Sequence, residues 1–281
     1  MKIKFWGTRG SIAVPGKDTT IYGGNTTCLE ITLASERKVI VDAGTGIRAL
    51  GDVLTSEREV VDLHLLITHI HWDHVLGFPF FAPIYNPSTR IIIDGFPTCM
   101  KGLRYTFDNK MGDGFFPIQF DDLRARIKYL DRINRGPLDL DGVLVDTIPL
   151  QHPQGGFGFR FREGEKTFIF LTDNELRDDA WTGRSPQDYA EFCRDADILV
   201  HDAQYTPEEI ADRRGWGHSD YLSVVRLALE ANVKRLILFH HDPSRKDVQV
   251  MAMKVLCDDF VRKEGATLVV EAAMENSEFD L

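Results

Sequence analysis

Four side chains of types that bind metal ions lie within six residues, directly after the apolar run Leu63–Ile67. They are His69, His71, Asp73 and His74. Side chains this close together cannot all point the same way from a regular strand or helix, so the segment is best explained as a loop around metal. His69 and His71 share one face and can bind one ion, whereas Asp73 and His74 are offset enough to bind a second.

The same residue types recur just after four other stretches that the sequence predicts to be strands. These residues are His152 after 143–148, Asp173 after 166–171, Asp202 after 197–200 and His240 after 235–239. In α/β folds the active site usually lies at the rim where the carboxyl ends of the strands meet. We therefore expect these four residues to join the His69–His74 loop in one site.

The pattern His-x-His-x-Asp-His after a buried strand resembles the first metal-binding motif of the metallo-β-lactamase superfamily of metal-dependent hydrolases. The resemblance covers nearly the whole chain, because later segments match the remaining motifs in the same order. The chain is most similar to the phosphodiesterase branch, which includes ribonuclease Z, phosphoribosyl cyclic phosphodiesterase and cyclic-nucleotide phosphodiesterases. The resemblance implies an α/β fold, a four-layer αββα sandwich, with residues 1–281 forming a single hydrolase domain.

The resemblance also implies a binuclear metal site. Its ligands would be His69, His71 and His152 for one ion, Asp73, His74 and His240 for the other, and Asp173 as the bridge. Ligation rich in imidazole favours two Zn²⁺ ions, although Mn²⁺ or Fe would accept the same ligands. The last ligand is either His240 or its neighbour His241, and the match of Leu238–His240 to the family's last strand favours His240.

Three further residues have roles that the resemblance implies. The segment Gly217-His218-Ser219 matches one that supplies a proton-carrying histidine in the phosphodiesterase branch, and Asp202 corresponds to the acidic partner of that histidine. The expected reaction is attack on phosphorus by a metal-bridging hydroxide that Asp73 orients, while His218 protonates the leaving oxygen. Asp42 would support the metal loop through a hydrogen bond to a ligand histidine or to the backbone. The alternatives are a His218 that merely precedes a helix cap and an Asp42 that is an ordinary turn residue.

Periodicity and turn residues predict the elements that position these side chains. Strands are expected near 1–6, 28–33, 38–41, 143–148, 157–161, 166–171, 197–200, 235–239 and 267–270, and helices near 47–54, 186–194, 221–229 and 245–262. Apolar and polar residues alternate in the first strand, as in an edge strand. Ser219 is the expected N-terminal cap of the helix near 221–229. Residues 101–125 resemble a lid over the site.

Composition narrows the range of functions. A net charge of −10 argues against a surface that grips long nucleic acid, because each phosphate contact normally uses Lys or Arg. The N-terminus lacks the apolar core of a signal peptide, and the four widely spaced cysteines are typical of a reduced cytosolic protein. We therefore expect a cytoplasmic protein without a membrane span, and a homodimer is left open.

The spacing of two motifs bears on the substrate. Ribonuclease Z carries a tRNA-gripping arm between the motifs that match His152 and Asp173, but here only a hairpin's length of chain separates those residues. Together with the negative net charge, this short separation favours a small phosphodiester substrate such as a cyclic nucleotide or cyclic phosphate. The alternatives are tRNA 3′ processing of the ribonuclease Z type and, in a different class, a di-iron redox or sensor protein. Relatives of that last class have Glu where this sequence has His71, and they depend on a flavin domain.

Overall fold

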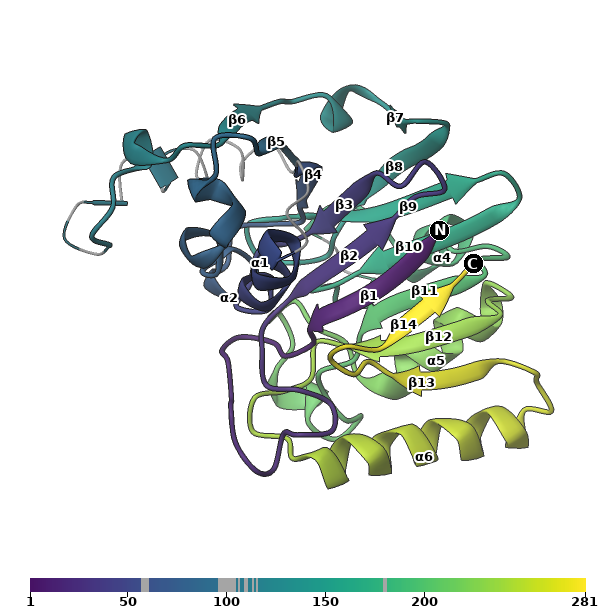
Figure 1. Cartoon of the computed structure of the whole chain (residues 1–281). Coiled ribbons are helices and arrows are strands. Elements are labelled where there is room, and N and C mark those ends of the chain that lie inside the picture. The colour runs from purple at the N-terminus through teal and green to yellow at the C-terminus, as the bar shows by residue number, and fades with distance from the viewer. Residues whose placement is uncertain are drawn as a thin grey trace.

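Two seven-stranded sheets pack face to face and form the centre of the molecule (Figure 1). The computed structural model describes residues 1–56, 61–95, 105, 107, 108, 111, 112, 114, 116–178 and 181–281. Each sheet is mixed, with antiparallel pairing in one half and parallel pairing in the other. In both sheets the parallel half directs several strand ends toward one rim.

The first sheet has the order β14-β1-β2-β3-β4-β5-β6. Its strands are β1 (Lys2–Gly7), β2 (Cys28–Thr32), β3 (Lys38–Val41), β4 (Asp62–Ile67), β5 (Arg90–Gly95), β6 (Arg126–Tyr129) and β14 (Glu278–Asp280). The second sheet has the order β13-β12-β11-β10-β9-β8-β7. Its strands are β7 (Leu138–Leu140), β8 (Val143–Pro149), β9 (Phe157–Glu163), β10 (Lys166–Leu171), β11 (Ile198–Asp202), β12 (Arg235–Phe239) and β13 (Val269–Ala272).

Helices cover the outer faces of both sheets (Figure 1). Within the described residues, the α-helices are α1 (Ile47–Ser56), α2 (Trp72–Val75), α4 (Pro186–Phe192), α5 (Tyr221–Glu230) and α6 (Asp247–Lys263). Helix α1 packs on the first sheet, whereas α4, α5 and α6 pack on the second. This order of layers, helix, sheet, sheet and helix, confirms the expected αββα sandwich.

Strand β10 illustrates why the sequence forms these layers. Alternate side chains of a strand point to opposite faces of its sheet. Phe168 and Phe170 therefore pack in the core between the sheets, whereas Ile169 and Leu171 pack against the helices. All four side chains are fully buried, and each contributes about 2 kcal/mol of hydrophobic stabilisation. Both faces of β10 are thus fixed, and with them the position of its carboxyl end.

The predicted bounds of β3, β10 and β12 are confirmed to the residue. Two local predictions are wrong. Strand β1 is not at the edge of its sheet, because β14 pairs with its outer side. The cap of α5 is Asp220 rather than Ser219, because the Asp220 side chain accepts hydrogen bonds from Leu222 N and Ser223 N.

In the predicted lid, 101–104, 106, 109, 110, 113 and 115 lie outside the described residues, so the lid stays a prediction.

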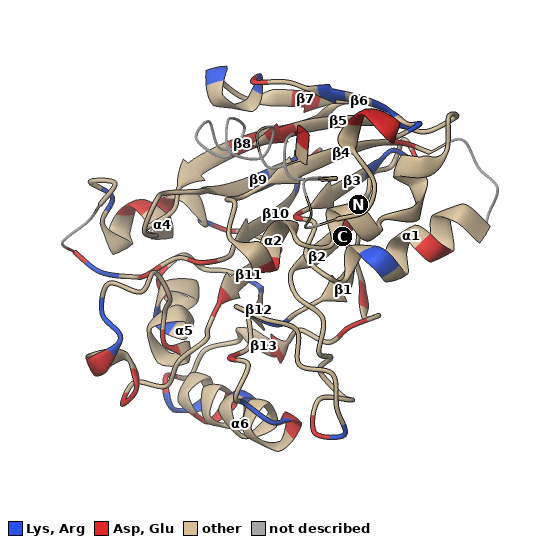
Figure 2. Ribbon diagram, turned by 90° about the vertical axis from the view of Figure 1, so that its left-hand side faces the viewer, with Lys and Arg blue, Asp and Glu red and all other residues tan. Residues whose placement is uncertain are grey.

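Acidic and basic residues are interspersed over the two sheets and the helices that cover them (Figure 2). Within the described ranges, no helix is both long enough and apolar enough to span a membrane.

Candidate functional site

The carboxyl ends of five strands meet at one rim, where they present the candidate site residues. Strand β4 leads into the loop that carries His69 to His74, and β8, β10, β11 and β12 end at or just before His152, Asp173, Asp202 and His240. Asp173 and His240 turn sharply away from their strands with φ values of 50° and 58°. A positive φ in a residue other than glycine costs of order 1 kcal/mol and is concentrated at functional sites.

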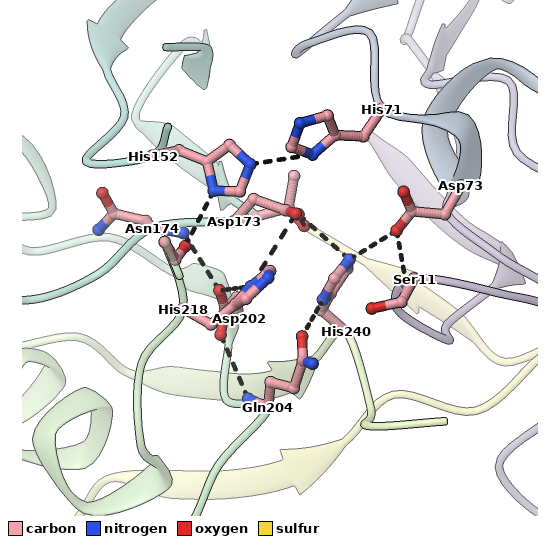
Figure 3. Close-up of polar contacts among 12 residues, drawn as sticks. Ser11, His71, Asp73, His152, Asp173, Asn174, Asp202, Gln204, His218 and His240 are labelled. Carbon is pink, nitrogen blue, oxygen red and sulfur yellow. Dashed lines mark hydrogen bonds and ion pairs between the residues drawn. The ribbon is translucent and has the colours of Figure 1, made fainter. Parts of the chain in front are cut away.

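The first group of side chains consists of His69, His71, His152 and Asp173, with one ligand atom from each lying within 4.8 Å of all the others. His71 Nδ1 lies 3.1 Å from His152 Nε2, and His69 Nε2 lies 3.5 Å from Asp173 Oδ2. His69, His152 and Asp173 are buried, and His71 is partly exposed; His71 and His152 face each other above Asp173 (Figure 3).

The second group consists of Asp73, His74, Asp173 and His240, all buried and spaced within the same limit. His240 Nε2 lies 3.1 Å from Asp73 Oδ2 and 3.2 Å from Asp173 Oδ1 (Figure 3). His74 Nε2 lies 3.3 Å from each of the same two oxygens. Asp173 thus belongs to both groups, with Oδ2 facing the first and Oδ1 facing the second.

Hydrogen bonds on the outer side of each ring fix the orientation of the five histidines. The bonds run from His69 Nδ1 to Thr68 Oγ1 (3.1 Å), His71 Nε2 to Gln154 Oε1 (2.8 Å), His74 Nδ1 to Asp42 Oδ2 (2.8 Å), His152 Nδ1 to Gly217 O (3.2 Å) and His240 Nδ1 to Gln204 Oε1 (2.9 Å). An acceptor beside the outer nitrogen favours the tautomer that carries its proton there, which leaves the inner nitrogen available to bind a cation.

Asp42 is central to this support. Its carboxylate is fully buried and accepts hydrogen bonds from Thr68 N, Thr68 Oγ1 and His74 Nδ1, each at 2.8 Å. It therefore joins the end of β4 to the imidazole of His74.

Burial and neighbouring charges set the protonation of the cluster. Burial lowers the pKa of His69 well below its usual value and that of His152 to about 4, so both rings are neutral at pH 7. Burial opposes ionisation of Asp173, but the surrounding histidines hold its pKa well below the usual value. Burial also opposes protonation of His74, but Asp73, Asp173 and Asp42 raise its pKa well above the usual value. The site therefore attracts positive charge.

The residues present fit a pair of divalent cations. Within the part of the chain that the structure describes, His69 Nε2 and His74 Nε2 are buried without a hydrogen-bond partner. A cation bound between the rings would give both nitrogens the partner that buried polar atoms need. Imidazole nitrogen and carboxylate oxygen are the donor types that Zn²⁺ accepts.

His218 and Asp202 form a pair beside the two groups. His218 Nδ1 donates to Asp202 Oδ2 at 2.9 Å, and the same nitrogen lies 3.9 Å from Asp173 Oδ2 (Figure 3). Burial opposes protonation of His218, but Asp202 raises its pKa to about 9. A cavity of about 260 Å³ is lined by Ser11, His71, Trp72, Asp73, Asp173, His218 and His240. The pair is thus buried at the edge of a cavity that both groups share.

The structure brings all the candidate site residues named from the sequence to this rim. His241, the alternative to His240, points elsewhere and donates from Nε2 to Ala273 O at 2.9 Å. Sequence reasoning missed Gln204 and Gln154, the acceptors of His240 and His71. The only signal for Gln204 is its position just after β11, and we find no comparable signal for Gln154.

The sequence also suggests that free backbone N–H groups of the Gly-rich turn Gly7–Ser11 could line the site, and the structure brings Ser11 to it. Its N–H donates to Asp73 Oδ2 at 2.7 Å, and its φ is 65°. The neighbouring Gly10 must be glycine, because a Cβ there would lie 2.3 Å from His240 Nδ1. The loop after β1 therefore packs directly on the second group of side chains.

Comparisons with known proteins place this chain among relatives of the same fold. Ribonuclease Z of Picrophilus torridus is 24% identical, and the alignment covers 98% of this chain and 97% of that protein. The metallo-β-lactamase fold protein YhfI from Bacillus subtilis superposes with a TM-score of 0.71 at 17% identity, covering 99% and 98% of the two chains. A diphosphatase of the PhnP family superposes with a TM-score of 0.66 at 16% identity, covering 100% and 97%.

The family profile of the beta-lactamase superfamily domain matches residues 37–241, which is more than half of the chain. That range includes all of the candidate residues from Asp42 to His240. The chain belongs to the β-lactamase superfamily, as a hydrolase with the metallo-β-lactamase fold.

Proposed function

We propose that this hydrolase is a two-metal phosphodiesterase that acts on a small phosphodiester, such as a cyclic nucleotide or a cyclic phosphate. The observation that carries the proposal is the His218–Asp202 pair, which lies at the same cavity as two groups of metal-binding side chains. The two groups suit metal-assisted hydrolysis in general. The added histidine suits the cleavage of a bond whose leaving oxygen needs a proton.

In this proposal the side chains divide between the two ions. His69, His71 and His152 would hold the first ion, Asp73, His74 and His240 would hold the second, and Asp173 would be shared between them. Zn²⁺ is the best fit to five imidazoles and two carboxylates, and Mn²⁺ or Fe would accept the same donors. A pair of such cations would activate water near neutral pH and neutralise charge on a phosphoryl group.

The protein's own groups would perform the remaining steps. Asp73 lies at the cavity, where Ser11 N donates to its Oδ2, and from there it would orient the attacking water. His218 would donate the proton of Nε2 to the leaving oxygen, because its Nδ1 is bonded to Asp202. Asp202 would keep the imidazole oriented throughout the reaction.

Three observations favour a small substrate. His152 and Asp173 are joined by the single hairpin β9–β10, so no RNA-gripping arm is inserted at that point. The net charge is −10, which disfavours long nucleic acid. The cavity of about 260 Å³ is slightly below the usual range for ligand pockets.

A ribonuclease of the tRNA 3′-processing type is the second candidate, because the relative that aligns over nearly the whole chain is a ribonuclease Z. We also propose that residues 1–281 act as one hydrolase domain, since the first sheet supplies His69 to His74 and the second supplies His152, Asp173 and His240.

The test is a hydrolysis screen with metal-reconstituted protein on cyclic nucleotides, cyclic phosphates, a synthetic aryl phosphodiester and a tRNA precursor. We expect turnover of the small substrates and none of the precursor. Asp173→Ala should abolish turnover, whereas the matched Asp139→Ala, on an exposed strand position, should leave it unchanged. Efficient, site-specific cleavage of the precursor would favour the second candidate.

A further inference from the structure

Glu175 is a buried carboxylate that the proposed reaction does not use. Its side chain lies two residues after Asp173 and is almost completely excluded from solvent. Gly215 N donates to both of its oxygens at 3.1 and 2.9 Å, and Gly217 N donates to Oε2 at 3.0 Å. Arg177 Nη1 donates to Oε1 at 3.3 Å. Because a buried carboxylate is costly unless it is fully bonded, these contacts specify where the 215–217 backbone must lie.

Gly217 connects this carboxylate to the first group of side chains. Its N–H is held by Glu175, and its carbonyl oxygen accepts the proton of His152 Nδ1 at 3.2 Å. The residue has a φ of 87°, and a Cβ added to it would lie 2.0 Å from His152 Nδ1. The backbone therefore passes as close to the imidazole as glycine allows. A shift of Gly217 would move the acceptor that orients His152.

The residue on the other side of His218 is anchored by the same segment of chain. Ser219 Oγ donates to Asn174 O at 2.6 Å and accepts from Leu176 N at 3.0 Å. His218 thus lies between two residues that are both held by residues 174–176. On the Gly217 side, Glu175 supplies that contact.

We propose that Glu175 is a positioning residue, which holds the Gly215–Gly217 backbone so that His218 reaches the leaving oxygen. This inference rests on the proposed function, because it assigns Glu175 to the placement of the proton donor. Two glycines at φ values of 85° and 87° give the loop many alternative conformations once the carboxylate is removed. A displacement of about 1 Å in a catalytic group can cost about 10²-fold in rate.

Glu175→Gln tests the proposal with little change in shape. An amide has one acceptor oxygen in place of two, so its NH₂ would face an N–H of Gly215 or Gly217. We expect turnover of an alkyl phosphodiester to fall about 10- to 100-fold, and turnover of a nitrophenyl phosphodiester to fall much less, because nitrophenolate hardly needs a proton. Both rates are measured at saturating metal, where the metal content should equal that of the unaltered protein because all seven proposed ligands remain.

Asp94→Asn is the matched control. Asp94 is also a buried carboxylate that accepts backbone N–H groups, from Gly95, Arg132 and Ile133, and none of these is a candidate site residue. The Asp94→Asn substitution should not change the ratio of alkyl to nitrophenyl turnover. A Glu175→Gln protein with the same ratio as the control would overturn the proposal.

A double-mutant cycle separates positioning from a general loss of stability. If Glu175 acts through His218, adding Glu175→Gln to His218→Ala should cause little further loss on the alkyl substrate. Fully additive losses would show that Glu175 acts elsewhere and would overturn the proposal. Should Glu175→Gln fail to fold, Glu175→Asp, which withdraws the carboxylate by one methylene, gives the same comparisons.

Amide hydrogen exchange supplies a readout that needs no activity. Glu175→Gln should raise exchange in peptides covering 213–219, and Asp94→Asn should not. Unchanged exchange in those peptides would overturn the proposal. If the unaltered protein hydrolyses none of the phosphodiesters, the proposed function fails, but the exchange result still decides whether Glu175 holds the loop.

Discussion

Replacing His218 by alanine should impair catalysis according to the leaving group. The imidazole is bonded to Asp202 at 2.9 Å, and it lines the same cavity as Asp73 and Asp173. Burial opposes its protonation, yet Asp202 raises its pKa to about 9, so the side chain carries the proton at pH 7. His218→Ala removes that proton donor and leaves every proposed metal ligand in place.

The expected loss follows from the usual contribution of general acid catalysis. For an alkyl phosphodiester, kcat should fall by about 10² to 10⁴, which corresponds to about 3 to 5 kcal/mol in activation free energy. For a nitrophenyl phosphodiester the fall should be less than about 10-fold, because nitrophenolate departs without a proton. The assay compares kcat for both substrates at pH 7 and measures metal per chain by plasma mass spectrometry.

His64→Gln is the control, since it removes another buried histidine from the interior of β4. It should keep the ratio of the two rates. Equal losses on both substrates in His218→Ala would refute the reasoning and show that His218 positions substrate. A loss of metal would instead indicate that His218 coordinates an ion.

Two further predictions concern support of the site and stability. Asp42→Asn should weaken metal affinity about 10- to 100-fold, measured by competition with a chelator, because it removes the charge that orients His74; unchanged affinity would contradict that role. Burial, with Arg37 nearby, lowers the pKa of His64 to about 4, so the folded state resists protonation that the unfolded chain accepts near pH 6.5. Its contribution to stability should be complete above pH 6.5 and fall by up to about 3 kcal/mol toward pH 4. The test is urea unfolding of the unaltered protein and of His64→Gln at pH 7 and at pH 4.5. Between these pH values the free energy of unfolding should change by a different amount in each protein. Equal changes in the two proteins would contradict the assignment.

Strands such as β3, β10 and β12 are predictable because both of their faces are buried. Segments such as Lys166–Leu171 and Arg235–Phe239 are short apolar runs that end at polar turns, which fixes their limits. Strand β14 is not predictable in the same way, since Glu278–Asp280 is short and polar. It forms because β1 leaves its outer backbone groups free to pair.

The site is predictable where the residue types themselves indicate metal binding. His69 to His74 and the residues after later strands carry the ligand chemistry in the sequence itself. The supporting contacts are not predictable, because an acceptor such as Gln154 or the Gly217 carbonyl is defined only by its place in three dimensions. The error at Ser219 has the same origin. Ser219 and Asp220 are both good caps, and tertiary bonds to Asn174 and Leu176 engage Ser219 elsewhere.

Titrating the metal-free protein with Zn²⁺ while following hydrolysis of an aryl phosphodiester tests the central claim most directly. The seven side chains form two groups that share Asp173, so the protein should bind two ions per chain. Activity should appear in full only as the second equivalent binds, and His71→Ala or Asp173→Ala should lower both the metal content and the activity. Full activity in the metal-free protein, or two bound ions without phosphodiester hydrolysis, would contradict the account.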